Sequence, residues 1–318
     1  MILANDDACF EVMTGAVAPH GCDCVVPIER LSITEGEATL ADDVVITPGM
    51  NIHARGLDCR AGEALLDTGT RLGPAEIAII ASAGLARTQV TREPRIMVIS
   101  TGDELIEPGE PVMDWQIYRS NAYAVLSSLQ QRGYGQLTHD HLPDDREILR
   151  ERLQSHLQTQ DVLILSGGVS MGKFDYVPQI LGELGVELAF HKVAQRPGKP
   201  MWFGVGPNGR TVYALPGNPV STLVCLTRYV YLGLSAAMGQ AAAAPDKVAL
   251  AEPFDVKNAL TVFLPVKLIS DESGQVTAQP RPTRGSGDFT SLLGTDGFVE
   301  LAGPVSLTRG APVPFYRW

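Results

Sequence analysis

The amino-acid sequence predicts a multidomain α/β protein whose central domain contains a doubly wound, mostly parallel sheet. Between residues 93 and 241, short apolar runs alternate with amphipathic segments of helical spacing, which is typical of a parallel sheet covered by helices on both faces. On either side, strand-like runs are separated by turn residues. We therefore expect a β-rich N-terminal domain (1–92), this α/β domain (93–241) and a small β-barrel-like C-terminal domain (246–318).

The N-terminal domain is expected to contain several strands and one helix. Its strand-like runs are Asp23–Ile28, Glu37–Leu40 and Val44–Thr47. Gly73 followed by Pro74 indicates a helix with proline at its first position, and Gly84 is expected to end that helix.

The central domain carries the alternation itself. The expected elements, in order, are strand Arg95–Ser100, helix Asn121–Arg132, strand Gly135–Thr138, helix Asp145–Leu157, strand Asp161–Leu165, helix Tyr176–Leu184, strands Glu187–Val193, Met201–Val205 and Thr211–Ala214, and a long helix Pro219–Ala237. The alanine-rich stretch 239–245 is expected to form the boundary with the C-terminal domain. Beyond that boundary, the expected strands are Val248–Val256, Leu260–Ile269, Gln275–Gln279, Phe298–Leu301 and Pro312–Tyr316.

Composition restricts the partners and the compartment. The net charge of −11 argues against nucleic acid or an anionic membrane as the main partner, because both require a basic face. The longest apolar runs, such as Glu76–Leu85, are shorter than the roughly 20 residues that span a bilayer, and no leader sequence opens the chain. Five cysteines, an odd number, indicate reduced thiols. We therefore expect a cytoplasmic protein.

Three predicted strands of the central domain end in loops of small residues: Ser100–Glu104, Ser166–Ser170 and Leu215–Ser221. Ligands of open parallel sheets bind beyond the carboxyl ends of the strands, so these loops are expected to meet at one site. Glycine lets backbone N–H groups approach a phosphate, and Asn218 before Pro219 fits a helix N-cap. A tight turn without function is the alternative for each loop taken alone.

Carboxylates follow the same strands. Asp103 and Glu104 come after the first strand, Asp144 and Asp145 precede a helix, and Asp175 follows the Gly167-Gly168 loop. Mg²⁺ in proteins takes one or two carboxylates together with ligand phosphates, so this set predicts a cation site. A capping role is the alternative, above all for Asp144 and Asp145.

Basic residues gather in the segment from Lys192 to Pro200, which contains Arg196 and Lys199. Two prolines and a glycine exclude a helix there, so the cations are expected on a shaped loop that binds an oxyanion; a solvated basic turn is the alternative. The sequence has no G-x-S-x-G, H-E-x-x-H or G-x-x-x-x-G-K-[ST] motif, which argues against a serine hydrolase, a zinc protease or a P-loop phosphotransferase.

Taken together, these stretches resemble the molybdopterin molybdenumtransferase family, also called the MoeA or gephyrin E-domain family. The matching motifs are MTGA (13–16), P-x-G-x-D-x-V-V (19–26), STGDEL (100–105), IYRSN (117–121), PDD (143–145), SGGVSMG (166–172) with Asp175-Tyr176, RPGKP (196–200) and LPGNPVS (215–221). Their order also resembles that of the family over nearly the whole chain.

The resemblance implies a central domain of molybdopterin-binding type and a Mg²⁺-dependent transferase. It would insert molybdenum from molybdate into adenylylated molybdopterin and release AMP. Glu104, Asp144 and Asp175 would bind Mg²⁺ or assist catalysis, with Thr14 in the active-site cleft. Cofactor-binding residues would be the cationic loop (Lys192, Arg196, Lys199, Pro200), the small-residue loops (Gly102, Gly167, Gly168, Ser170, Gly217, Asn218, Ser221) and Ser286 of the R-G-S-G stretch. The resemblance also implies a homodimer, as is usual in the family.

The sequence also departs from the family pattern. The usual N-terminal helical segment and its aspartate in a D-G-Y-A motif have no counterpart here. Lys173 replaces a common glutamate, and Pro265 and the neighbourhood of Leu260 lack arginines that relatives often have. A non-catalytic molybdopterin-binding scaffold of the same fold is therefore the alternative function. Molybdate and tungstate stay equally open as the oxyanion.

Overall fold

The computed structural model describes residues 8–168, 176–240 and 243–318. By its internal contacts the chain divides between Asp67 and Thr68 into two compact units, each described by itself below. The domain boundaries expected near residues 92 and 241–246 remain predictions.

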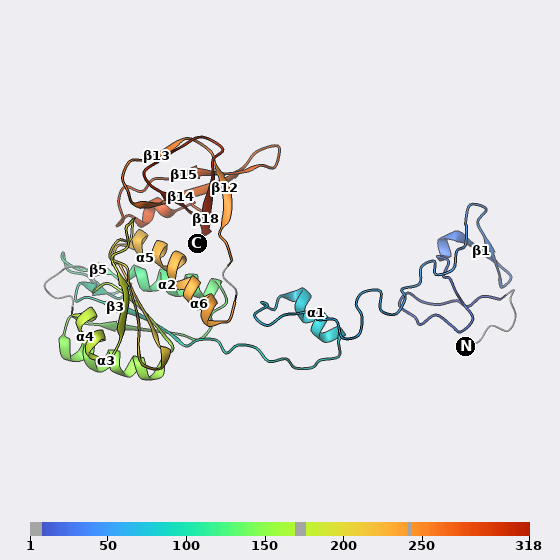
Figure 1. The fold of residues 1–318 in the computed structure, drawn as a ribbon, viewed down its shortest axis with the longest axis horizontal. Helices are drawn as coiled ribbons and strands as arrows, with labels where there is room; N and C mark the ends of the chain where they lie inside the picture. The colour runs from blue at the N-terminus through green and yellow to red at the C-terminus, as the bar shows by residue number, and fades with distance from the viewer. Residues whose placement is uncertain (1–7, 169–175, 241–242) are drawn as a thin grey trace. The chain divides into compact units, whose positions relative to one another are not determined.

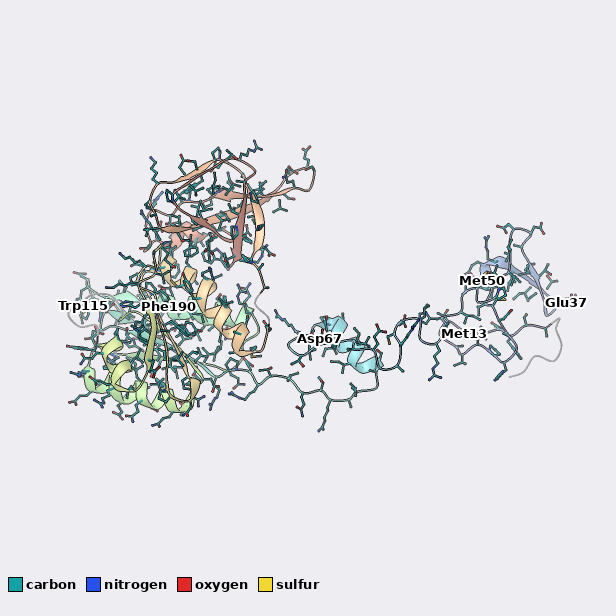
Figure 2. All side chains as sticks on the ribbon, viewed as in Figure 1. Met13, Glu37, Met50, Asp67, Trp115 and Phe190 are labelled. Atoms are coloured by element: carbon teal, nitrogen blue, oxygen red, sulfur yellow. The ribbon has the colours of Figure 1, made fainter. Side chains whose placement is uncertain are left out.

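The first unit contains little regular structure. A 3₁₀ turn, η1 (Ile28–Arg30), leads into an antiparallel hairpin of β1 (Leu31–Thr34) and β2 (Glu37–Leu40), in which Leu31 pairs with Leu40. Glu35 and Gly36 both have positive φ angles, as a two-residue hairpin turn requires. None of the described residues up to Asp67 is buried, and Figure 2 labels Met13, Glu37 and Met50 among them.

Two strands predicted in this unit are wrong. Asp23–Ile28 and Val44–Thr47 form no strand, whereas Glu37–Leu40 does. The backbone around Val25 is tied instead by isolated hydrogen bonds: Val25 N donates to Met50 O at 2.9 Å, and the Asn51 side chain donates to Val25 O at 2.8 Å. These bonds are isolated and do not form the repeating ladder of a strand.

The second unit begins with the helix predicted from Gly73-Pro74. Helix α1 (Pro74–Ser82) has Gly73 as N-cap residue and proline in its first turn. The Glu76 carboxylate accepts a hydrogen bond from Gly73 N at 2.9 Å, which satisfies one free N–H group of the helix start. Gly84 follows with a φ of 77°, so this helix is confirmed at both ends.

The central sheet has six strands in the order β6 (Leu137–Leu142), β3 (Ile96–Thr101), β7 (Val162–Ser166), β11 (Thr211–Leu215), β10 (Trp202–Val205) and β8 (Glu187–His191). The first four are parallel, and β10 runs antiparallel to both of its neighbours. Every residue of β3 and β7 is buried, as expected of central strands in a sheet covered on both faces.

Helices cover both faces of this sheet (Figure 1), which confirms the doubly wound α/β class. On one face, α3 (Arg146–Thr159) and α4 (Val177–Glu183) pack against Met97 and Ile99. On the other, α2 (Ser120–Gln131) and the run from α5 (Pro219–Cys225) through η3 (Leu226–Val230) to α6 (Tyr231–Ala237) pack against Ile96 and Val98. Successive residues of β3 thus serve opposite cores.

Several predicted bounds are wrong. Strand β6 extends to Leu142, because its polar residues pair with buried β3. Strand β8 ends at His191, because Lys192 has a φ of 67°. The predicted strand Val248–Val256 is divided into β12 (Asp246–Leu250) and β13 (Phe254–Val256), which pair with different partners.

The expectation that all apolar segments are too short to span a bilayer is wrong for the long helix Pro219–Ala237. It is 19 residues long with a mean hydropathy of 1.3, so by length and composition it qualifies as a membrane span. However, 56% of this apolar window is buried inside the protein, where Val224, Leu226, Val230 and Leu234 contribute to its cores. Its apolar character is therefore explained by packing against the sheet and the barrel.

The C-terminal region forms a closed barrel, as predicted. Strands β12, β18 (Pro312–Arg317), β16 (Gly297–Ala302), β14 (Thr261–Ser270) and β15 (Val276–Pro280) pair in sequence, and β15 returns to β12. Strand β9 (Gln195–Arg196) of the α/β region adds to β14, and Phe263 and Phe298 of the barrel pack on Val220 and Val224 of α5. The shorter elements are β4 (Leu105–Ile106), β5 (Ile117–Tyr118), η2 (Pro207–Gly209), η4 (Phe289–Leu292) and β17 (Val305–Leu307).

Candidate functional site

A cavity of about 860 Å³ lies where the carboxyl ends of β3, β7 and β11 meet the basic loop and the barrel. Among its lining residues are most of those predicted from the sequence: Gly102, Glu104, Asp144, Gly167, Gly168, Arg196, Lys199, Pro200, Gly217, Asn218, Ser221 and Ser286. The three small-residue loops thus converge, as the position of strand ends in a parallel sheet requires.

Close contacts with Thr101 require glycine in the loop that follows β7. A Cβ atom on Gly167, whose φ is 99°, would lie 2.8 Å from the carbonyl oxygen of Thr101. On Gly168 it would lie 2.8 Å from Thr101 Oγ1. An ideal Cβ on Gly217 would lie 3.8 Å from the Cα of Gly167. At Gly167 and Gly168 the contacts with Thr101 leave no space for a side chain, whereas the distance at Gly217 is an ordinary van der Waals contact.

Asn121 links two of the loops. Its Nδ2 donates to Ser166 Oγ at 2.9 Å and to Gly217 O at 2.7 Å. The end of β7 and the loop after β11 are therefore joined by one side chain. Asn121 was quoted within the IYRSN motif but was not predicted as a site residue; a polar residue at a helix start, where it can reach neighbouring strand ends, is the signal that marks it.

Asn218 occupies the N-cap position of α5, but its side chain does not cap the helix. Nδ2 donates instead to Ser286 Oγ at 2.7 Å, and Val220 N donates to Ser286 O at 3.0 Å. The predicted capping side chain is therefore wrong, and Asn218 joins the LPGNPVS loop to the R-G-S-G loop of the barrel region.

The neighbouring aspartates at the start of α3 have different positions. Asp145 caps the helix, because its Oδ1 accepts from Glu147 N at 3.0 Å and from Ile148 N at 2.9 Å. Asp144 lines the cavity, and its backbone N donates to Asp103 Oδ1 at 3.1 Å. Glu104 lines the same cavity from the loop after β3. Asp144 is thus the member of the pair that lines the cavity.

The basic loop contributes Arg196 and Lys199 to the cavity wall, together with Pro197, Gly198 and Pro200. Lys192 is exposed and is not among the lining residues, so only the later part of the loop lines the cavity. Next to it, the pKa of His191 is lowered, first by burial and then by the charge of Lys192. Arg284, which was not predicted individually, adds a third cation.

Three further predicted residues are Thr14, Ser170 and Asp175. Thr14 is exposed in the first unit. Ser170 and Asp175, like Lys173, lie outside the described residues. The cavity lining also includes residues that sequence reasoning did not single out: Thr101, Gln195, Thr283 and Leu260. Leu260, noted as a departure from the family, thus places an apolar side chain in the wall.

Chemically, the cavity brings two carboxylates and three cationic side chains to one space lined by glycine-rich loops. Cations bind the oxygens of anionic groups, and carboxylates bind a hard metal ion that bridges such groups. The fold and this cavity define an α/β protein with a charged cavity at the carboxyl ends of its parallel strands, closed on one side by the C-terminal barrel region.

Three family models match the chain in succession: the MoeA N-terminal region (domain I and II) over residues 2–84, a probable molybdopterin binding domain over 97–234 and the MoeA C-terminal region (domain IV) over 247–318. The molybdopterin molybdenumtransferase of Synechocystis sp. is 41% identical over 318 residues, covering 99% of this chain and 79% of the relative. The enzyme of that name from Haemophilus influenzae is 31% identical, covering 91% and 72%.

Solved structures agree. A molybdopterin biosynthesis MoeA protein from Pyrococcus horikoshii superimposes with a TM-score of 0.75 and 26% identity, over 100% of this chain and 79% of that one. A second MoeA structure from the same organism gives a TM-score of 0.74 and 32% identity, over 96% and 74%. The chain therefore belongs to the MoeA family, which confirms the resemblance found in the sequence.

Proposed function

We propose that this chain acts in molybdenum cofactor biosynthesis, inserting molybdenum from molybdate into adenylylated molybdopterin with release of AMP. The observation that carries the proposal is the cavity in which carboxylates, cations and amide-rich loops face one space. The substrates carry several oxyanions, which such a lining suits. The names of the curated relatives support the same transferase activity.

The roles follow from charge and position. Arg196, Lys199 and Arg284 bind phosphate or molybdate oxygens, because cation–oxyanion attraction grows several-fold as a cleft excludes water. The glycine loops offer backbone N–H groups to the nucleotide and the pterin. Lys192, Thr14, Ser170 and Asp175 keep the binding and catalytic roles that the family resemblance implies, as predictions.

Mg²⁺ fits the carboxylates of the cavity. Among the residues that the structure describes, no group of three or more His, Cys, Asp or Glu side chains could hold a metal ion alone. Mg²⁺ does not need one, since it takes one or two carboxylates and completes its shell with water and ligand phosphates. Glu104 and Asp144 would hold the ion, and Asp175 is the predicted third ligand. The bound ion would neutralise charge on the adenylyl phosphate.

The test is AMP release from adenylylated molybdopterin with molybdate and Mg²⁺. We compare the unmodified chain with Glu104→Gln and Asp144→Asn, and use Glu147→Gln, an exposed carboxylate on α3, as the control. AMP release by the unmodified chain should require molybdate. In either cavity variant, release should fall by at least roughly ten- to hundred-fold, the loss typical of removing an outer-shell metal partner. In the control variant, release should not fall.

Binding without release would contradict the transferase and favour the alternative, a molybdopterin-binding scaffold of the same fold. Equal release by the cavity variants and the control would contradict the assignment of the carboxylates while leaving the activity in place.

We further propose that the chain forms a homodimer in the cytoplasm. The first unit exposes many large apolar side chains, among them Met13, Val17, Ile33, Val45 and Leu57. An apolar surface of that kind favours a protein partner, and the family resemblance implies that the partner is a second copy. The five cysteines are free thiols, as a reducing compartment favours.

A further inference from the structure

Beneath the basic loop, the side chain of Gln195 is 1% exposed and fully hydrogen-bonded. Its Nε2 donates to the carbonyl oxygen of Pro197 at 3.0 Å and approaches Cys225 Sγ at 3.6 Å. Its Oε1 accepts a hydrogen bond from the hydroxyl of Tyr229. Because a glutamine amide has two donors and one acceptor oxygen, this environment determines which way the amide faces.

Cys225 extends the same support by one residue. Its Sγ donates to the carbonyl oxygen of Gly198 at 3.7 Å, and burial raises the pKa of the thiol to about 12, which keeps the donor proton in place. A Cβ on Gly198, whose φ is 93°, would lie 2.6 Å from both Cys225 Sγ and Gln195 Nε2. The loop backbone therefore rests directly on these two side chains.

The support is attached to both parts of the cavity wall. Tyr229 and Arg228 lie on the π-helical turn η3, and Arg228 Nε donates to Glu300 Oε2 of the barrel at 2.9 Å. Gln195 itself pairs with Thr261 of the barrel through the β9–β14 ladder. A π turn within an α-helix often marks a functional position, and here it presents adjacent side chains to the loop and the barrel.

We propose that Gln195 is a positioning residue, which fixes the carbonyl of Pro197, next to the Gly198 carbonyl held by Cys225, so that Arg196 and Lys199 stand at the cavity for an oxyanion. Tyr229 and Cys225 hold the amide of Gln195 in the required orientation. The role rests on the proposed function for the identity of the oxyanion, but the order of the loop does not depend on it.

The experiment compares the unmodified chain with Gln195→Met, which keeps the size of the side chain and removes its donors. Tyr229→Phe is the second variant; it removes only the hydroxyl and retains the ring, which lies 6.1 Å from that of Phe190. The matched control is Thr227→Val on the same turn, where the buried Oγ1 has no hydrogen-bond partner in the described structure.

Two quantities are measured: amide hydrogen exchange in peptides covering residues 194–202, and binding of inorganic molybdate and of AMP as separate probes. Gln195→Met should raise loop exchange and weaken molybdate binding, each by roughly ten-fold, the equivalent of about one lost hydrogen bond. Tyr229→Phe should act in the same direction with a smaller effect. Exchange in β3 and β7 should stay unchanged, and Thr227→Val should alter neither quantity.

Unchanged loop exchange in Gln195→Met would overturn the proposal. If that variant does not fold, unchanged loop exchange in Tyr229→Phe overturns it equally. Faster exchange accompanied by equal loosening of β3 and β7 also overturns it, because the residue would then serve general stability. If the unmodified chain binds neither probe, the proposed function loses support while the exchange comparison still decides the role of Gln195.

Discussion

At the scale of single residues, the cavity depends on positions where a side chain has no space. Gly167 combines a φ of 99° with a backbone oxygen 2.8 Å from where its Cβ would stand. The neighbouring backbone, unlike a flexible side chain, cannot move away without displacing the end of β3. Gly182 near the end of α4 offers the contrast, since nothing lies within 4 Å of its ideal Cβ.

Gly167→Ala should therefore lower the free energy of unfolding by about 1–3 kcal/mol, through strain at an unfavourable φ and the contact with Thr101. Gly182→Ala should leave that free energy unchanged or raise it by up to about 1 kcal/mol, since alanine is the better helix former. Urea denaturation measures both. Equal stability of the two variants would show that the loop relaxes freely.

Asp161 illustrates a residue whose charge is matched by its neighbours. It accepts hydrogen bonds from Arg92 at 2.8 Å, from Arg95 N at 2.9 Å and from Arg210 at 2.6 Å. The hydrogen bonds from Arg92 and then Arg95 hold the pKa of this carboxyl well below its usual range. The ionised form is therefore favoured by folding, and the network ties the start of β3 to β7.

Asp161→Asn should lower the free energy of unfolding at pH 7 by on the order of 2 kcal/mol. Because the folded pKa is depressed, this stabilisation is present above the unfolded value of about 3.9 and is lost as pH falls from there through the folded value. Urea denaturation at pH 7 and pH 3 should show a smaller difference at pH 3. A constant difference would mean that the charge of Asp161 is not its source.

At the scale of elements, a helix start and the cavity wall lie side by side. Adjacent aspartates at the beginning of α3 divide these tasks: Asp145 accepts hydrogen bonds from the free N–H groups of the helix, and Asp144 lines the cavity. The division follows from helix geometry, because the N-cap side chain must turn back to the second and third helical residues.

Asp145→Ala should lower the free energy of unfolding by about 1 kcal/mol through loss of the cap, with AMP release per folded molecule retained. Asp144→Ala should instead abolish most of the AMP release, because Asp144 lines the cavity. Thermal denaturation and the release assay, run on both variants, separate the effects. Loss of release in Asp145→Ala at full folding would place Asp145 in the site instead.

At the scale of the whole molecule, the two units differ in how they are stabilised. Thr68–Trp318 contains the buried cores of the sheet and the barrel, whereas the described residues up to Asp67 include none that is buried. A unit without a core of its own is expected to gain stability from a partner surface. The proposed homodimer supplies that surface.

Light scattering coupled to size exclusion should therefore give twice the chain mass for the unmodified protein. Ile33→Asp should shift it toward the monomer, because a charge placed in an apolar interface loses its hydration. Ser32→Asp, the adjacent residue whose side chain points to the other face of β1, should remain dimeric. A monomer at all concentrations for the unmodified chain would contradict the dimer.

Local patterns were sufficient for much of this protein. Apolar runs identified β3, β7 and β11, the Gly-Pro signal identified α1, and the loops after the strands identified most of the cavity wall, because alternation, helix starts and strand ends depend on neighbouring residues.

Tertiary contacts decided the rest. Strand β6 extends further than predicted because its polar residues pair with β3. In the described structure, Val44–Thr47 pairs with no neighbouring strand. Asn121 and Gln195 are held by partners up to 96 residues away, such as Gly217 for Asn121, and Arg284 lines the cavity from the C-terminal region. Distances of that kind are set when the chain packs, since a short stretch of sequence carries no information about which distant backbone group its side chain will meet.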